Sequence, residues 1–216
     1  MDRALAVAFL VSSEGTTMDD LARRIADGAL PARIVLVVTD RAGAPAIDRA
    51  RQRGLPTLVL PRRSGDDRSW GEELSRQLER AGAELIVNAG FLSILPDDWV
   101  ARWAGRAVNL HPSLLPRHGG HGMYGLRVHR AVLAAGDRET GATVHLVTRD
   151  VDAGPAIDQA RLAVVPGDTP ESLRARLHPV EVELLARTIR RFATGELPLP
   201  YRPRPAATRA DDDLRG

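Results

Sequence analysis

An amide and an imidazole stand two residues apart near the middle of the sequence, as Asn109 and His111. Residues two apart in an extended strand project from the same face, so we expect both side chains to reach one ligand. An amide N–H can hydrogen-bond a developing oxyanion, and an imidazole titrates near neutral pH and can donate or move a proton. The pair therefore suits acyl-type transfer.

A structural role is the alternative, since most Asn and His side chains in proteins only satisfy local hydrogen bonds. The chain contains just two Asn, Asn88 and Asn109, and both fall at the ends of predicted strands. Strand ends are where α/β sheets bind ligands, which favours the functional interpretation.

Two carboxylates, Asp150 and Asp152, come shortly before the turn residues Gly154 and Pro155. Acids in such turns commonly hydrogen-bond their own backbone. The functional alternative is that one of them orients His111 and raises the pKa of its ring through a nearby negative charge. Spacing along the chain leaves both interpretations open.

A second candidate site joins the first predicted strand to the first predicted helix, at residues 12–17. Gly15 permits a tight turn or a positive φ, and the N–H groups at a helix start attract anions such as phosphate. The structural alternative is a capped helix in which Thr17 and Asp20 form a capping-box-like pair. The segment lacks the three-glycine dinucleotide fingerprint and a phosphate-loop lysine, which disfavours nicotinamide and nucleoside triphosphate cofactors. Glu14 is unfavourable beside a phosphate because like charges repel.

Composition excludes several classes of chemistry. Cys and Lys are both absent, which excludes disulfides, thiolate nucleophiles, Cys-based metal sites and Schiff bases. His111, His118, His121 and His129 match no common zinc spacing, so we predict no metal. The formal net charge of +2 gives no strong positive field, and no run approaches the roughly 18 apolar residues of a membrane span. We expect a cytoplasmic protein, monomer or homodimer, that binds neither nucleic acid nor membrane.

Strand and helix patterns alternate through the first half of the chain. This order predicts βαβ units in a single Rossmann-like α/β domain, with a mainly parallel twisted sheet and helices on both faces. Short apolar runs predict strands at 4–12, 34–39, 57–60, 85–88 and 107–109, and apolar residues at helical spacing predict helices at 17–26 and 70–81.

The second half begins with a loop rich in Pro, His and Gly. A helix is predicted at 126–135 and a long amphipathic helix at 170–192, with apolar runs at 142–148 and 156–165 between them. The surface apolar stretch Trp99–Trp103 would serve a dimer or cap the sheet, and we favour the cap. We expect one domain over residues 1–195 and a mobile tail over 196–216. Loops after Ser12, Asn88 and Asn109 should form the site, because ligands bind at the carboxyl ends of such strands.

The segments Ala89–Leu95, Asn109–Pro116 and Val151–Pro155 closely resemble the phosphoribosylglycinamide formyltransferase family, folate-dependent enzymes of purine synthesis. The likeness runs in order from about Leu5 to Phe192. It implies a formyltransferase domain that moves a formyl group from 10-formyltetrahydrofolate, as co-substrate, to the amine of 5'-phosphoribosylglycinamide. A reduced folate and a small-molecule substrate would then be its partners.

The resemblance also implies roles for individual residues. Asn109 would polarise the formyl oxygen, His111 would donate a proton and bind the oxyanion, and Asp152 would raise the pKa of His111. Glu181 would be the acid at the glycinamide substrate. Its phosphate would lie against Gly15, Thr16 and Thr17. The folate site would comprise Arg68, Leu92, Ser93, Ile94, Leu95, Asn109, Thr148, Arg149, Asp150, Val151 and Asp152.

The sequence departs from the family pattern in several places, one of which is the loop over residues 119–125, longer than in many members. Ser13 and Glu14 stand in the phosphate loop where glycine and a small or amide residue are usual, and Ser93 stands where Arg is frequent. His178-Pro179 interrupts the segment that leads to Glu181. Formyl chemistry is therefore the firmer expectation and the acceptor the open one. A formyltransferase for an amino sugar or natural-product amine, or an inactive nucleotide- or folate-binding module, remain the alternatives.

Overall fold

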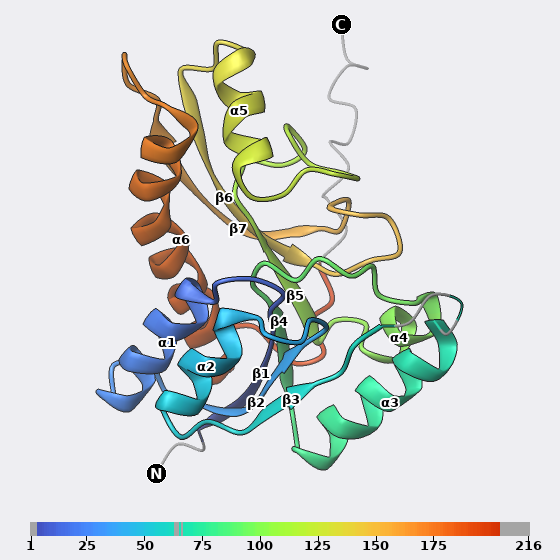
Figure 1. Ribbon diagram of the computed structural model, residues 1–216. Helices are drawn as coiled ribbons and strands as arrows, with labels where there is room; N and C mark the ends of the chain where they lie inside the picture. The colour runs from blue at the N-terminus through green and yellow to red at the C-terminus, as the bar shows by residue number, and fades with distance from the viewer. Residues whose placement is uncertain (1–3, 63–64, 66, 204–216) are drawn as a thin grey trace, which may run out of the picture.

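A seven-stranded sheet forms the centre of the protein in the computed structural model, which describes residues 4–62, 65 and 67–203 (Figure 1). The strand order is β3-β2-β1-β4-β5-β6-β7. β1 to β5 run parallel, and β6 and β7 continue the sheet antiparallel, which confirms a mainly parallel α/β fold. The strands are β1 (Leu5–Leu10), β2 (Ala32–Thr39), β3 (Thr57–Val59), β4 (Leu85–Asn88), β5 (Ala107–His111), β6 (Glu139–Leu146) and β7 (Ala156–Ala163).

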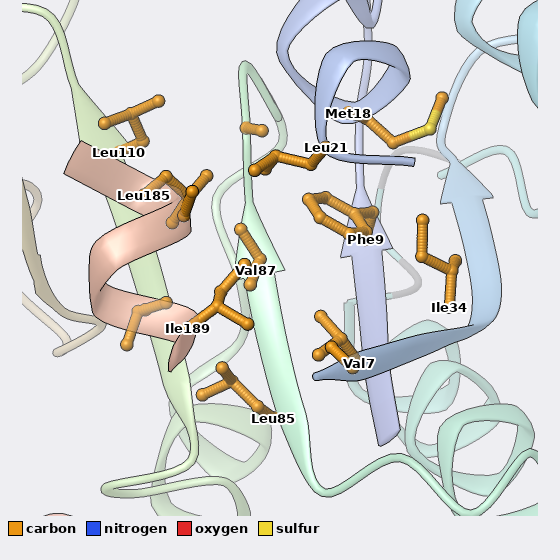
Figure 2. Close-up of a cluster of buried hydrophobic side chains, with 14 of the residues drawn as sticks. Val7, Phe9, Met18, Leu21, Ile34, Leu85, Val87, Leu110, Leu185 and Ile189 are labelled. Atoms are coloured by element: carbon orange, nitrogen blue, oxygen red, sulfur yellow. The ribbon is translucent and has the colours of Figure 1, made fainter. Parts of the chain in front are cut away.

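Helices cover both faces of the parallel strands, which explains why these strands read as nearly continuous apolar runs. One hydrophobic cluster lies between the sheet and α1 (Thr16–Ala26), α2 (Pro45–Gln52) and α6 (Pro170–Ala193). Figure 2 shows Phe9 of β1 beside Met18 and Leu21 of α1 in this cluster. A second cluster lies between the opposite face and α3 (Asp67–Arg80) and α4 (Asp97–Arg102). The remaining helix, α5 (Leu126–Ala134), packs against α6.

The structure corrects the sequence interpretation at several elements. Trp99 and Trp103 cap the sheet as favoured, but each is only 2% exposed, so the stretch is core rather than surface. β5 continues to His111 because its last residues pair with β6, a partner that the sequence pattern did not reveal. Helix α2 was not singled out from the sequence.

Part of the predicted tail packs on the domain. Leu197 is buried, and the ring of Tyr201 meets Phe192 edge to face at 6.2 Å between centroids. The Tyr201 N–H donates to the Gly105 carbonyl oxygen at 2.7 Å. Residues 204–216 of that tail lie outside the described residues. None of the helices in the described ranges has both the length and the apolar character needed to cross a membrane.

The strand order reverses between β1 and β4, where the chain passes from β3-β2-β1 to β4-β5. In doubly wound sheets the carboxyl ends of the strands at this switch form a crevice that binds ligands. The segments after β1, β4 and β5 therefore meet at one edge of the sheet, which is where the sequence placed its candidate residues.

Candidate active site

The carboxylate of Asp152 joins the two side chains singled out first in the sequence. Its Oδ2 lies 3.3 Å from His111 Nδ1, and its Oδ1 accepts a long hydrogen bond of 3.4 Å from the Asn109 amide. Asn109 and His111 project from β5, whereas Asp152 belongs to the loop between β6 and β7. The structure therefore brings the three residues together from separate segments.

Backbone geometry holds the Asp152 carboxylate in this position. Asp152 has φ 56°, in the left-handed region that Asp adopts more readily than most residues. The Gly120 N–H, from the loop after β5, donates to Asp152 Oδ2 at 3.0 Å. Such strained backbone persists where surrounding contacts fix it, and it is common at functional sites. Two loops are thus tied together at this carboxylate.

His145 is a member of the site that the sequence interpretation missed. It lies directly opposite Asn109 in the β5–β6 ladder and is 3% exposed. Its Nδ1 faces the Leu146 carbonyl at 2.9 Å, which places the ring proton there and leaves Nε2 as an acceptor. The Asn109 amide nitrogen lies 3.0 Å from that Nε2. The available signal was a histidine within an apolar run, where burial makes a polar partner necessary.

Burial and charge act in opposite directions on His111. Burial of the ring lowers its pKa, whereas the Asp152 carboxylate and the His118 carbonyl raise it, and the net shift is downward. Asp152 thus acts in the direction that the sequence resemblance implied, but desolvation outweighs it. Both ring nitrogens face oxygens, since Nε2 lies 2.9 Å from His118 O. A neutral imidazole donates on one side only, so a second proton would satisfy both contacts.

Asp152 is held as a carboxylate despite its surroundings. Burial alone would raise the pKa of Asp152, but the His145 ring 3.5 Å from its Oδ1, the positive charge of a protonated His111 and the Gly120 N–H lower it below the ordinary value. An ionised Asp152 supplies the negative charge that a protonated His111 requires. The two groups are therefore coupled, and the charge of Asp152 favours a proton bound at His111.

Helix α1 begins at the loop predicted to bind an anion. Gly15 is the residue before the first turn, with φ 67°, and no described side chain caps the N–H groups of that turn. The alternative of a capping pair formed by Thr17 and Asp20 is not what the structure has, because Thr17 lies within the helix and Asp20 bonds Arg23 and His178 instead. Donors at the start of α1 are consequently available to a phosphate.

The acids near this helix start have basic partners. The carboxylate of Glu14 lies 3.8 Å from Arg49, whose Nε donates to the Glu14 carbonyl at 3.0 Å. Asp19 pairs with Arg53, and this contact lowers the pKa of the Asp19 carboxyl. The repulsion expected from Glu14 is reduced accordingly, which favours an anion at Gly15.

Glu181 lies on α6, where it is partly buried. Its carboxylate lies 3.7 Å from Nδ1 of His178, and Nε2 of His178 lies 2.7 Å from Asp20 of α1. The negative charge of Glu181 also acts on His111, raising its pKa. Glu181 therefore lies within electrostatic reach of the catalytic candidates and is linked through His178 to the helix of the anion loop.

The predicted folate segments lie on either side of Asn109. Leu92 N–H donates to Ser12 Oγ at 2.8 Å, and Ser93 Oγ donates to Asp40 at 2.6 Å. Ile94 is exposed, whereas Leu95 is buried. In the second segment, Thr148 Oγ1 donates to the Asp150 carbonyl at 3.0 Å, Val151 is exposed, and exposed Arg149 lies 3.7 Å from Asp97. Both segments thus present apolar side chains and backbone groups beside the site.

Two arginines near the first folate segment differ in how they are held. The Arg68 side chain is 81% exposed, bonds Glu72 on α3 at 3.2 Å and lies 3.9 Å from Asp98 on α4. Arg62, which the sequence interpretation did not select, donates to the Ile94 carbonyl at 2.6 Å and lies over the Trp70 ring at 5.7 Å. Arg62 is therefore the arginine that the structure fixes against this segment.

A surface cavity of about 470 Å³ lies beside the site, between residues 114–118 and the β6–β7 pair. Its walls include Arg117 paired with Asp137 and Arg161 paired with Glu139. Asn109, His111 and Asp152 do not line it, so we do not place the reaction there. Within the described ranges, no three His, Asp or Glu side chains are arranged to hold a metal ion.

Comparison with known proteins finds relatives over most of the chain. A family model described as formyl transferase matches residues 5–189. The phosphoribosylglycinamide formyltransferase of Haemophilus influenzae is 32% identical over 194 residues, covering 89% of this chain and 89% of that protein. The trifunctional purine biosynthetic protein adenosine-3 of Drosophila pseudoobscura pseudoobscura is 39% identical over 88% of this chain. This chain spans only 14% of the length of that trifunctional relative.

Solved structures extend the likeness to three dimensions. Glycinamide ribonucleotide transformylase 1 from Symbiobacterium toebii superimposes with a TM-score of 0.84 at 32% identity, covering 92% of each chain. The phosphoribosylglycinamide formyltransferase of Coxiella burnetii gives a TM-score of 0.83 at 37% identity, covering 90% of this chain and 89% of that one. The shared fold therefore includes nearly all of the described chain.

Proposed function

Because the chain belongs to the formyl transferase family, we propose that it transfers a formyl group from 10-formyltetrahydrofolate to the amine of 5'-phosphoribosylglycinamide, a step of purine biosynthesis. The observation that carries the proposal is the Asp152 carboxylate, which holds Asn109 and His111 in one polar cluster. Relatives named for this activity match nearly the full chain, which supports the same reaction.

The reaction needs no covalent intermediate on the protein. The substrate amine attacks the formyl carbon, and the formyl oxygen becomes an oxyanion bound by the Asn109 amide and by His111 Nε2. As the oxyanion forms, the Asn109 amide leaves His145 Nε2 and His111 Nε2 leaves the His118 carbonyl. The oxyanion is the stronger acceptor because it is charged. The intermediate then collapses with loss of the tetrahydrofolate nitrogen. The proton released by the amine balances the one that this nitrogen takes up.

The acceptor is proposed to be phosphorylated because of the loop before α1. Its phosphate would bind the uncapped N–H groups at Gly15, Thr16 and Thr17. Glu181 would accept hydrogen bonds from the glycinamide end. Glu14, which could have favoured a cationic amine, has its carboxylate turned to Arg49, so no observation supports an amino sugar over the phosphorylated acceptor.

A comparison of acceptors tests this proposal. With 10-formyltetrahydrofolate as donor, kcat/KM should be at least about 100-fold higher for 5'-phosphoribosylglycinamide than for the riboside without phosphate, since several charge-assisted hydrogen bonds are lost together. Equal values, or a preference for an amino sugar, would refute the acceptor. Failure to bind any reduced folate by calorimetry would instead indicate an inactive module.

We also propose that the enzyme works in the cytoplasm, as a monomer or homodimer, without metal and without nucleic acid. The near-neutral charge and the absence of Cys support this. Turnover should be unchanged after dialysis against a chelator, and sedimentation at several concentrations distinguishes the two assembly states. Loss of turnover that zinc restores would contradict the metal-free reaction.

A further inference from the structure

A buried amide at the end of β4 has a polar atom without a partner. Asn88 is 7% exposed, and its Oδ1 is buried and accepts no hydrogen bond from the residues that the structure describes. A buried carbonyl oxygen left unpaired costs free energy, so native proteins usually complete such an atom with water or a ligand. The catalytic scheme above makes no use of Asn88.

The position of Asn88 in the sheet shows where such a ligand would lie. Val87 projects to the face covered by α1 and α6 (Figure 2), so alternation along the strand directs Asn88 to the face covered by α3 and α4. Asn88 pairs in register with Asn109, and Asn109 pairs with His145. These three polar residues form a row across neighbouring strands. Asn88 is thus one strand spacing, about 4.8 Å, from the amide that is proposed to hold the formyl oxygen.

Apolar side chains lie on the same face of the sheet as Asn88. Ile86 lies on the same face of β4, and the segment after the strand contributes Phe91 and Leu95 to the same cluster. Flat heterocycles bind to walls of this kind, with a few polar groups fixing their orientation. Asn88 is the polar group of this wall that lies beside Asn109.

We propose that Asn88 accepts a hydrogen bond from an N–H group of the heterocycle that carries the formyl group, and so fixes the ring of the donor beside Asn109. The inference rests on the proposed function, because it requires the formyl carbon to lie at Asn109. A reduced pterin has ring N–H groups a few bonds from the nitrogen that bears the formyl group. Asn88 is therefore a positioning residue for the donor and has no direct role toward the acceptor.

Binding of tetrahydrofolate and of 5'-phosphoribosylglycinamide, measured separately by calorimetry, tests this. Asn88→Leu keeps the branching at Cγ and the number of side-chain heavy atoms but has no acceptor, and it should weaken tetrahydrofolate binding about 3- to 10-fold, the worth of one hydrogen bond. The acceptor affinity should not change. Asn88→Asp keeps an acceptor oxygen and should restore the affinity for tetrahydrofolate to within about 2-fold of the wild type. That difference is smaller than the one expected for loss of a hydrogen bond. Ile86→Val, one step back on the same face, is the matched control.

Two further measurements separate positioning from a purely structural role. Unliganded Asn88→Leu should melt about 2–4 °C higher, because it removes an unpaired buried oxygen, while its KM for the formyl donor rises and kcat changes little. Unchanged tetrahydrofolate affinity in Asn88→Leu, or Asn88→Asp as weak as Asn88→Leu, would overturn the inference alone. No tetrahydrofolate binding by the wild type would overturn the proposed function as well.

Discussion

Replacement of Asp152 by Asn tests whether one carboxylate organises the site. An amide has one acceptor oxygen where the carboxylate has two. If that oxygen keeps the Gly120 N–H and His111, the new amide nitrogen faces the amide nitrogen of Asn109, donor against donor. Losing one charge-assisted hydrogen bond costs about 1.5–3 kcal/mol, so we expect kcat to fall about 10- to 150-fold. Single-turnover kinetics with saturating donor would isolate this step.

Asp168 provides the matched control for this substitution. Its side chain is 3% exposed and is held by Ser172 and Arg176, outside the site. Asp168→Asn therefore makes the same chemical change to a buried carboxylate, and it should lower stability while leaving kcat unchanged. Wild-type kcat in Asp152→Asn, or an equal loss of kcat in Asp168→Asn, would refute the reasoning.

Three other changes have definite expected outcomes. Asn109→Ala should lower kcat about 10²–10³-fold in single-turnover assays, and full activity would remove its oxyanion role. Gly15→Ala should lower the free energy of unfolding in urea by about 1–3 kcal/mol, because φ at this residue is 67° and the new Cβ would lie 2.6 Å from Ala46 Cβ. The same change should raise KM for the phosphorylated acceptor. An unchanged KM would contradict the phosphate site. Burial holds the folded pKa of His111 below the unfolded value of 6.5, so its contribution to stability is complete above about pH 6.5 and declines below it. NMR titration should show a still lower pKa for His111 in Asp152→Asn, and a higher one would contradict the charge argument.

The sequence predicted the sheet and its site-bearing edge well, for local reasons. The limits of β4 match the prediction, and those of α6 differ by one residue, because a buried strand and an amphipathic helix each have a strong periodic pattern. Parallel strands also place the loops after Ser12, Asn88 and Asn109 at one edge whatever their exact pairing. The sequence alone therefore places Asn109 and His111 together.

Features that depend on strand order or packing could not be predicted in this way. Asn88 and His145 flank Asn109 only because β4, β5 and β6 are neighbours, which no local pattern encodes. The start of α1 was open between an anion site and a capping pair, and Gly15, fitted against Ala46 of another helix, takes the N-cap position. The net pKa shift of His111 depends on how deeply the ring is buried, which is a property of the whole fold.

The two proposed substrate sites are associated with opposite faces of the sheet. The helices α1 and α6, which present the Gly15 loop and Glu181, cover one face, whereas Leu95 of the segment proposed to bind folate packs on the other with α3 and α4. Acceptor and donor would then approach from opposite faces, and the amine and the formyl carbon would meet only at the end of β5. In such a site the amine reaches the formyl carbon directly, so no side chain is needed to carry the formyl group between the two substrates. Direct transfer is therefore the chemistry that this geometry favours, in a chain that contains neither Cys nor Lys to act as the carrier.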